Sequence, residues 1–205
     1  VAPARIRAQI TARDYREAIC YSFVAKDWLA RGSSATGAVA LANPLSADLA
    51  VMRTSLLPGL VEAMKYNLNR QQPRVRLIEL GRVFAAGGDE SAPAETVRLA
   101  AVACGRATAE SWNGERRDVD FHDIKGDLES LLALRGSTGD IEFRPLDRPD
   151  FHPGRSAEVV IGGVSAGIVG CLHPRLTKVL DLDVEVQAFE LDMRSEEHTS
   201  ELQSH

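Results

Sequence analysis

The sequence predicts an α+β fold in which an antiparallel sheet is flanked by helices. Two apolar runs over residues 156–172 meet at Gly162-Gly163, a pattern typical of a β-hairpin. Apolar residues over 57–68 recur at helical spacing, which predicts a helix with one buried face. Strand-like segments follow one another along the chain with helical segments between the groups, as in α+β proteins with antiparallel pairing.

The chain is expected to begin with a helix over residues 3–13. Pro3 suits a first helical turn, where its missing N–H group costs nothing. Ile6 and Ile10 are four residues apart and therefore share one face of that helix.

A strand is expected next, over residues 17–24. Ile19, Tyr21 and Phe23 alternate with smaller side chains, so all three are expected on one side of this strand. A short helix over 25–31 is expected to follow.

The expected helix near residue 57 has a clear beginning. Thr54 or Ser55 can cap it, and Pro58 lies in its first turn. Gly81, inside the next apolar run, indicates a bend or a close approach of another group. The remaining expected elements are strands over 74–84, 97–105 and 186–193, a helix over 120–134, and a short helix opened by His173-Pro174.

Composition and charge exclude several classes of protein. Apolar residues make up 44% of the 205 residues, enough for a folded core, and no apolar run is long enough to span a membrane. Aromatic residues are only 5%, and the net charge is 24 − 29 = −5, which argues against a general nucleic-acid surface. Three widely spaced cysteines are typical of reduced thiols in a cytoplasmic protein.

The segment over 118–123 is a candidate metal site because it gathers three acids and His122. The acids are Asp118, Asp120 and Asp123. The competing interpretation is helix capping, because negative side chains are favoured at the helix N-terminus expected there. No second ligand cluster completes a coordination set, so capping is preferred.

Two further candidates are a thiol–imidazole pair and a lone arginine. Cys171 and His173 are two residues apart and would share a strand face, but no orienting acid is evident, and a buried structural cysteine is preferred. Arg53 either binds an anion or pairs with an acid across an interface, and the residues around it leave both alternatives open.

Long segments of the chain, in order and spacing, resemble the β subunit of bacterial phenylalanyl-tRNA synthetase. The resemblance covers essentially all of residues 1–193, which we take as one domain. The segments are YREAICYSFV, NPLSADLAVMRTSLLPGLVEAMKYNLNRQQPRVRLIELGRVF, VDFHDIKGDLESLL, HPGRSAEVVIGGVSAGIVGCLHPRL and FELD. The resemblance implies a fold like the core of class II aminoacyl-tRNA synthetases.

The resemblance also implies a core without chemistry of its own. Class II enzymes hold the ATP α-phosphate with an arginine in an F-R-x-E motif, and the matching place here is Phe84 followed by Ala85-Ala86. No G-x-G-x-x-R stretch of the third class II motif occurs in 1–193. We therefore expect no catalytic, cofactor-binding or metal-binding residue here, with ATP and magnesium used by the assembled enzyme, and we interpret Arg53 as structural.

The implied partner is the α subunit of an α2β2 cytoplasmic enzyme that charges tRNA(Phe) with phenylalanine. The expected contact residues are Ile6, Ile10, Ile19, Tyr21 and Arg53, some of which will belong to the internal core. Contacts with tRNA(Phe), editing and anticodon binding are expected from other parts of a longer protein. The alternatives are a stand-alone interaction module, or an enzyme using Cys171 with His173 or the acids of 118–123.

The last twelve residues, RSEEHTSELQSH over 194–205, differ in style from the rest of the chain. They are similar to the in-frame translation of a common sequencing adapter. We therefore expect them to be non-native and exclude them from the fold.

Overall fold

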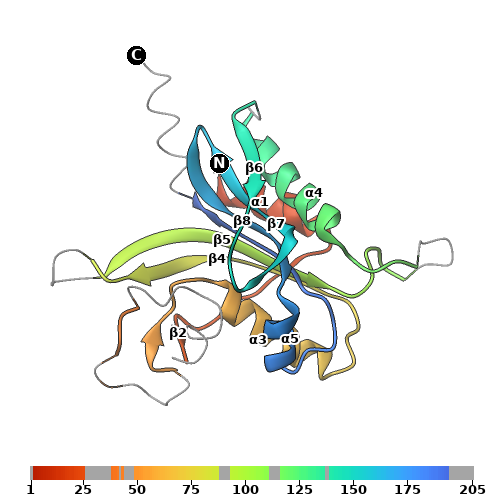
Figure 1. The fold of residues 1–205 in the computed structure, drawn as a ribbon, viewed down its shortest axis with the longest axis horizontal. Helices are drawn as coiled ribbons and strands as arrows, with labels where there is room; N and C mark the ends of the chain where they lie inside the picture. The colour runs from red at the N-terminus through yellow and green to blue at the C-terminus, as the bar shows by residue number, and fades with distance from the viewer. Residues whose placement is uncertain are drawn as a thin grey trace.

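A seven-stranded sheet with the strand order β1-β4-β5-β9-β8-β7-β6 forms the centre of the molecule (Figure 1). The computed structural model describes residues 2–25, 38–41, 43, 49–87, 93–110, 116–136 and 139–193. The helical elements are α1 (Pro3–Thr11), α3 (Leu57–Leu68), α4 (Phe121–Leu132), the 3-10 helix η2 (Ala133–Arg135) and α5 (Pro174–Val179). The strands are β1 (Arg16–Glu17), β2 (Phe23–Val24), β3 (Val51–Met52), β4 (Val75–Ala85), β5 (Ala94–Cys104), β6 (Ile141–Pro145), β7 (Phe151–Ile161), β8 (Val164–Leu172) and β9 (Gln187–Asp192).

The main sheet is antiparallel at every described pair except the one between β1 and β4. The expected antiparallel arrangement is therefore confirmed for most of the sheet and wrong at this edge. Between β1 and β4 the chain passes through β2, β3 and α3. A long crossover of this kind is what parallel pairing requires, whereas a tight hairpin would have produced the antiparallel form.

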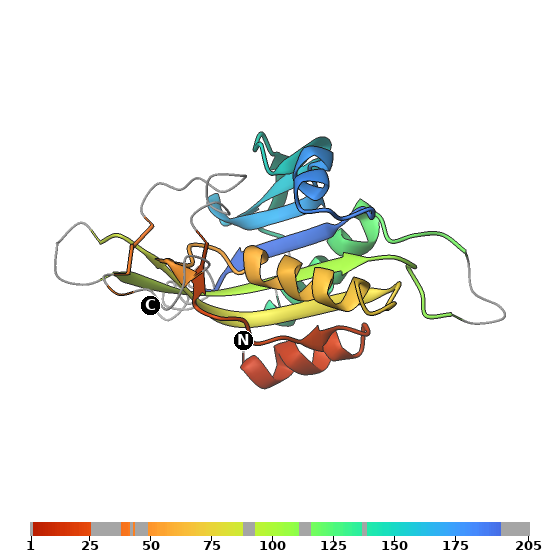
Figure 2. The ribbon, with the colours of Figure 1, turned by 90° about the horizontal axis from the view of Figure 1, so that it is seen from below.

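Helices cover both faces of the sheet. Figures 1 and 2 show α1 and α4 on one face and α3 and α5 on the other. Alternating side chains of one strand serve both cores: Leu77 of β4 packs in the core with α3 and α5, and the next residue, Ile78, packs in the core with α1 and α4. The central strand β5 does the same with Ala101 and Val102, which explains why its sequence is apolar on both sides.

The continuous strand expected over 17–24 is wrong. The chain forms the two-residue strand β1, continues without strand pairing, and then forms β2, which pairs with β3 in a separate small sheet. The Ala18 N–H group still donates to the Ile78 carbonyl of β4 at 2.8 Å, which is the last backbone–backbone hydrogen bond that the described residues 16–24 make with the main sheet. Of the alternating residues that predicted a strand, Ile19 and Tyr21 therefore lie on a connection between two sheets and face solvent, whereas Phe23 lies in β2 and is partly buried.

Most other elements agree with the sequence pattern. The helices α1, α3, α4 and α5, the strands β4, β5 and β9, and the hairpin of β7 and β8 are confirmed. Strand β6 was not expected, because charged residues alternate through it and it lies at the sheet edge. The helix expected over 25–31 and the residues 194–205 lie outside the described part of the chain, except for Ala25.

Helix α3 begins differently from the expectation. Its N-cap position is Leu56, which has no capping side chain of its own, instead of Thr54 or Ser55. Ser55 Oγ accepts the Leu57 N–H group at 3.2 Å, and Glu190 Oε1, from strand β9, accepts the Leu56 N–H group at 2.7 Å. A distant carboxylate therefore satisfies the helix terminus, which local sequence could not indicate.

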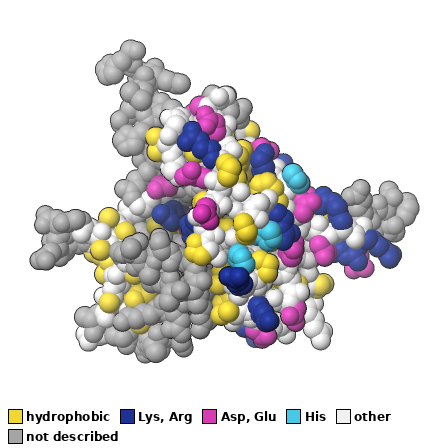
Figure 3. Space-filling model, viewed as in Figure 1, with side chains coloured by type: hydrophobic (Ala, Val, Ile, Leu, Met, Phe, Trp, Pro, Cys, Tyr) yellow, Lys and Arg dark blue, Asp and Glu magenta, His cyan; other side chains and the backbone are white. Residues whose placement is uncertain are grey.

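Positive and negative side chains are intermingled on the face of the molecule shown in Figure 3. That mixture agrees with the small net charge of −5. Within the described ranges, none of the helices is both long and apolar enough to cross a bilayer.

Candidate interaction surface

Two large apolar side chains of the connection between β1 and β2 face solvent. Ile19 is 94% exposed and Tyr21 is 77% exposed. Exposed apolar side chains are common singly, but two on one short extended segment indicate a contact surface. We call residues 19–21 the exposed segment.

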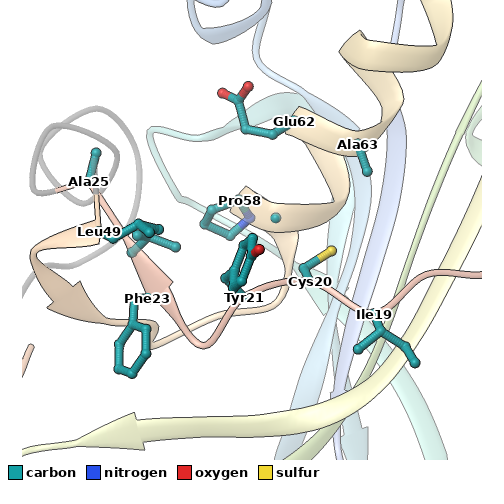
Figure 4. Close-up of a pocket in the computed structure, with 11 residues that line it drawn as sticks. Ile19, Cys20, Tyr21, Phe23, Ala25, Leu49, Pro58, Glu62 and Ala63 are labelled. Carbon is teal, nitrogen blue, oxygen red and sulfur yellow. The ribbon is translucent and has the colours of Figure 1, made fainter. Parts of the chain in front are cut away.

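A pocket of about 500 Å³ lies beside this exposed segment (Figure 4). Its wall is formed by the chain from Ile19 to Ala25 and by the first turns of α3, with Leu49 completing it. Pro58 and Gly59 of α3 line it, and the only charged residue of its described lining is Glu62. A predominantly apolar pocket next to exposed apolar side chains is suited to accept side chains of a protein partner.

Ile6 and Ile10 lie elsewhere. They are 4% and 1% exposed, and they pack in the core shared with α4. This is the internal-core alternative that the sequence left open for some of the expected contact residues. The structure thus places Ile19 and Tyr21 on the surface, whereas Ile6 and Ile10 lie in the internal core.

Arg53 is also buried, at 4% exposure, and is held by protein groups. Its Nη1 donates to Glu79 Oε1 at 2.7 Å, and its Nε donates to the Arg82 carbonyl at 2.9 Å. A guanidinium in this position joins its own segment to strand β4. Arg53 thus pairs with an acid, but this acid belongs to its own chain and does not lie across an interface, as the sequence alternative had it.

A second pair, partly buried, lies near the start of α3. Arg98 Nη1 donates to Glu190 Oε2 and to the Thr54 carbonyl, both at 3.1 Å. Glu190 is 6% exposed and also accepts the N–H group at the helix start. Sequence reasoning missed this pair, although a glutamate and an arginine inside largely apolar strands were a usable signal.

A third network joins the chain just after α1, strand β4 and helix α4 through the buried Asp127. Its carboxylate accepts from Arg13 at 2.8 Å, from Arg76 at 2.9 Å and from the Tyr15 hydroxyl at 2.8 Å. Burial raises the pKa of Tyr15 well above its ordinary value, and the charge of Asp127 raises it further. Sequence reasoning missed this network too; the signal was an acid inside the apolar stripe of the helix, beside Leu128.

Two of the three acids of 118–123, Asp120 and Asp123, form a helix cap, as preferred from the sequence. Asp120 is the N-cap residue of α4, and its Oδ1 accepts the N–H groups of His122 at 2.8 Å and Asp123 at 3.1 Å. Asp123 Oδ2 accepts the Asp120 N–H group at 2.9 Å, which completes a capping box. Hydrogen bonds from Arg117 lower the pKa of Asp123. The described residues contain no group of three side chains placed to hold a metal ion.

Replacing Asp120 with alanine is expected to lower the free energy of unfolding by about 1 kcal/mol, because two N–H groups lose their acceptor. Urea unfolding followed by circular dichroism measures this change. Asp118→Ala is the matched control from the same acidic segment, and it is expected to change stability by less than about 0.5 kcal/mol. Equal effects of the two substitutions would contradict the assignment of Asp120 as the cap.

Cys171 and His173 each have a structural place. Cys171 is 1% exposed, and burial raises the pKa of its thiol, which disfavours the nucleophilic thiolate. His173 is the N-cap residue of α5, where its Nδ1 accepts the Arg175 N–H group at 3.0 Å. The geometry therefore supports the buried structural cysteine over the thiol–imidazole pair.

The folded chain is expected to react slowly with a thiol reagent at neutral pH. Burial raises the pKa of Cys20 to about 12 and that of Cys104 to about 11, and Cys171 shifts in the same direction. Thiolate is the reactive form, so labelling is expected to become fast only in denaturant. Mass spectrometry of iodoacetamide-treated protein checks this, and rapid native labelling of Cys171 would revive the thiol candidate.

The architecture defines the class of the protein as one with the fold of the class II aminoacyl-tRNA synthetases. A solved structure titled as a pyrrolysyl tRNA synthetase from Desulfitobacterium hafniense aligns with a TM-score of 0.71, over 97% of this chain and 67% of that chain. The sequence identity is 11%, so the alignment shows a shared fold alone.

The family follows from the sequence comparison. The pattern of the family described as phenylalanyl tRNA synthetase beta chain CLM domain matches residues 2–193, and this chain belongs to that family. The phenylalanine–tRNA ligase beta subunit of Xanthomonas campestris (strain 8004) is 51% identical over 188 residues, and that of Xylella fastidiosa (strain Temecula1) is 49% identical over 187 residues. These alignments cover 92% and 91% of this chain but only 24% and 23% of the relatives, so the chain spans about a quarter of their length. The resemblance seen in the sequence is confirmed.

Proposed function

We propose that this chain is the non-catalytic, class II-like core of a phenylalanine–tRNA ligase β subunit and that it binds the α subunit. The α subunit would carry the ATP-dependent attachment of phenylalanine to tRNA(Phe). The observation that carries the binding proposal is the exposed segment, with Ile19 at 94% and Tyr21 at 77% exposure beside an apolar pocket. The family of this chain is described as a beta chain, and its relatives are named beta subunits, which implies an assembly with a partner subunit.

The charged groups around residues 53–56 support the non-catalytic part of the proposal. Arg53 pairs with Glu79 and Arg98 pairs with Glu190, and all but Arg98 are less than 9% exposed. Groups that bind ATP phosphates must present positive charge to a site open to the ligand. These arginines are instead neutralised by carboxylates of the same sheet, and strand β4 ends at Ala85, where class II enzymes have their ATP-binding arginine.

The remaining parts of the proposal follow from the family. We propose an α2β2 assembly in the cytoplasm, with ATP and magnesium bound by the catalytic subunit. The relatives are about four times as long as this chain, so contacts with tRNA(Phe) belong in the proposal to their other parts.

Light scattering after gel filtration tests the binding proposal. The chain is mixed with the α subunit of a bacterial phenylalanyl-tRNA synthetase, and a stoichiometric complex is expected. Phenylalanine-dependent exchange of pyrophosphate into ATP is expected to be absent from the chain alone. A stable monomer that does not bind the α subunit would favour an independent interaction module. Pyrophosphate exchange catalysed by the chain alone would overturn the non-catalytic assignment.

Tyr21→Ala is expected to weaken binding to the α subunit at least about tenfold, because tyrosines at the centre of interfaces often dominate affinity. Tyr66→Ala is the matched control: Tyr66 is 58% exposed and lies in the last turns of α3, outside the described lining of the pocket. Isothermal titration calorimetry measures both variants. A loss of affinity in the control alone would place the interface elsewhere.

A further inference from the structure

We propose that the buried Arg53–Glu79 ion pair is a positioning element for the contact with the partner. It determines the backbone path of residues 20–22 and thereby the way in which Ile19 and Tyr21 are presented. The inference rests on the proposed function, because it concerns the same surface, and it assigns a role to two residues that do not themselves touch the partner.

Arg53 holds three consecutive residues of this path by their carbonyl groups. Its backbone N–H group donates to the Ser22 carbonyl at 2.9 Å. Its Nη1 lies 3.4 Å from the Cys20 carbonyl oxygen and 3.5 Å from that of Tyr21. One side chain and its own backbone therefore replace the strand pairing that residues 20–22 lack.

Glu79 also bonds the backbone of this path, at the N–H group of Cys20. Its Oε1 accepts the Cys20 N–H group at 3.4 Å and the Arg53 Nη1 group at 2.7 Å. Glu79 lies in β4, which pairs along its whole length with β5. The exposed segment is therefore connected by two charged groups to a strand inside the sheet, which is a rigid reference for its position.

Two glycines make this arrangement sterically feasible. A Cβ atom on Gly81 would lie 2.6 Å from Arg53 Nη2, and a Cβ atom on Gly59 would lie 2.6 Å from the Cβ atom of Cys20. Only glycine leaves room for the guanidinium on β4 and for Cys20 against α3. The close approach expected at Gly81 from the sequence is thus explained by the arginine side chain.

A positioning role of the buried ion pair can be distinguished from a contribution to stability by replacing both residues with apolar ones. Taking both charges out of water is costly, so an apolar pair of similar size is often equally stable. An apolar pair keeps the bond from the backbone of residue 53 to Ser22 but cannot bond the backbone of Cys20 and Tyr21. Binding to a segment that is not held in place loses affinity, because the partner must then order it.

The double variant Arg53→Met/Glu79→Leu tests the proposal, measured for α-subunit affinity, thermal unfolding and amide hydrogen exchange. We expect the midpoint of unfolding to change little and the affinity to fall at least about tenfold. The Cys20 amide, which donates to Glu79, is expected to exchange at least about tenfold faster. Replacing the exposed Arg82–Glu95 pair, whose side chains are 68% and 50% exposed, by the same two residues is the matched control and is expected to change none of these. An affinity within twofold of the native chain, with unchanged exchange, would overturn the proposal.

Arg53→Lys is a second variant, which tests the same role if the double variant does not fold. Lysine retains the charge beside Glu79 but lacks the planar group that bonds Glu79 and the Cys20, Tyr21 and Arg82 carbonyls together. Faster exchange and weaker binding are expected at near-native stability, and unchanged values of both would overturn the role. If the native chain itself does not bind the α subunit, the proposed function fails. The exchange rates of the free variants then decide separately whether the pair orders the segment.

Discussion

Replacing Asp127 with asparagine is expected to lower the free energy of unfolding by about 3–5 kcal/mol, the largest effect expected from a single polar substitution here. Asp127 is 5% exposed and accepts from Arg13, Arg76 and the Tyr15 hydroxyl. Asparagine keeps the size of the side chain but not its charge. The Arg76 guanidinium, whose side chain is 6% exposed, would then be buried without its compensating carboxylate.

Urea unfolding monitored by circular dichroism measures this loss. Glu129→Gln is the matched control, because Glu129 lies on the same helix and pairs at 2.5 Å with Lys125 at the surface. Surface pairs four residues apart contribute only about 0.3–0.5 kcal/mol, so the control is expected to remain close to native stability. Losses of similar size in the two variants would show that the network around Asp127 does not hold the chain after α1, strand β4 and helix α4 together.

Replacing Gly167 with alanine is expected to cost at least about 3 kcal/mol or to prevent folding. Gly167 lies in β8 and pairs with β7 on one side and β9 on the other. A Cβ atom there would lie 2.1 Å from the Glu190 carbonyl oxygen and 2.9 Å from the Leu191 Cα atom. Both are backbone atoms of a paired strand, so no side-chain rotation relieves the contact.

Gly126→Ala is the matched control for this prediction, with the opposite expected sign. Gly126 lies in the middle of α4, and a Cβ atom there would meet nothing within 4 Å. Alanine is expected to stabilise the helix by about 0.5–1 kcal/mol, because glycine loses more backbone freedom on folding. Thermal unfolding of both variants checks the pair, and a destabilised Gly126→Ala variant together with a tolerated Gly167→Ala variant would contradict this account of packing.

Helix α4 and the hairpin of β7 and β8 were predictable because their signals are local. In α4 the cap at Asp120 and the apolar residues Ile124 and Leu128 lie within one short window. In the hairpin, Gly162 and Gly163 both have positive φ values, 57° and 80°, which the turn requires and glycine adopts without strain. The local preferences at these elements agree with the tertiary fold, so the structure adds little to them.

The candidate surface could be predicted only in part. Ile19 and Tyr21 were identifiable as an apolar, alternating pair, but the same pattern predicted a paired strand. Whether such a segment lies inside a sheet depends on what pairs with it, and β1 leaves the sheet edge after two residues. The sequence likewise could not tell what Ile6 and Ile10 pack against. Their helical spacing predicts one apolar face, whether that face contacts α4 or another subunit.

The sequence by itself determined the order of most of the main elements, the cap of α4, the turn between β7 and β8, and the family, because these depend on neighbouring residues or on a linear pattern. Only the tertiary structure decided the partner of Arg53, which is Glu79, 26 residues further along the chain, and the parallel edge of the sheet. It also decided the exposure of Ile19 and Tyr21. Charge pairing, strand direction and solvent exposure depend on which distant segments the fold places side by side, and no local pattern contains that information.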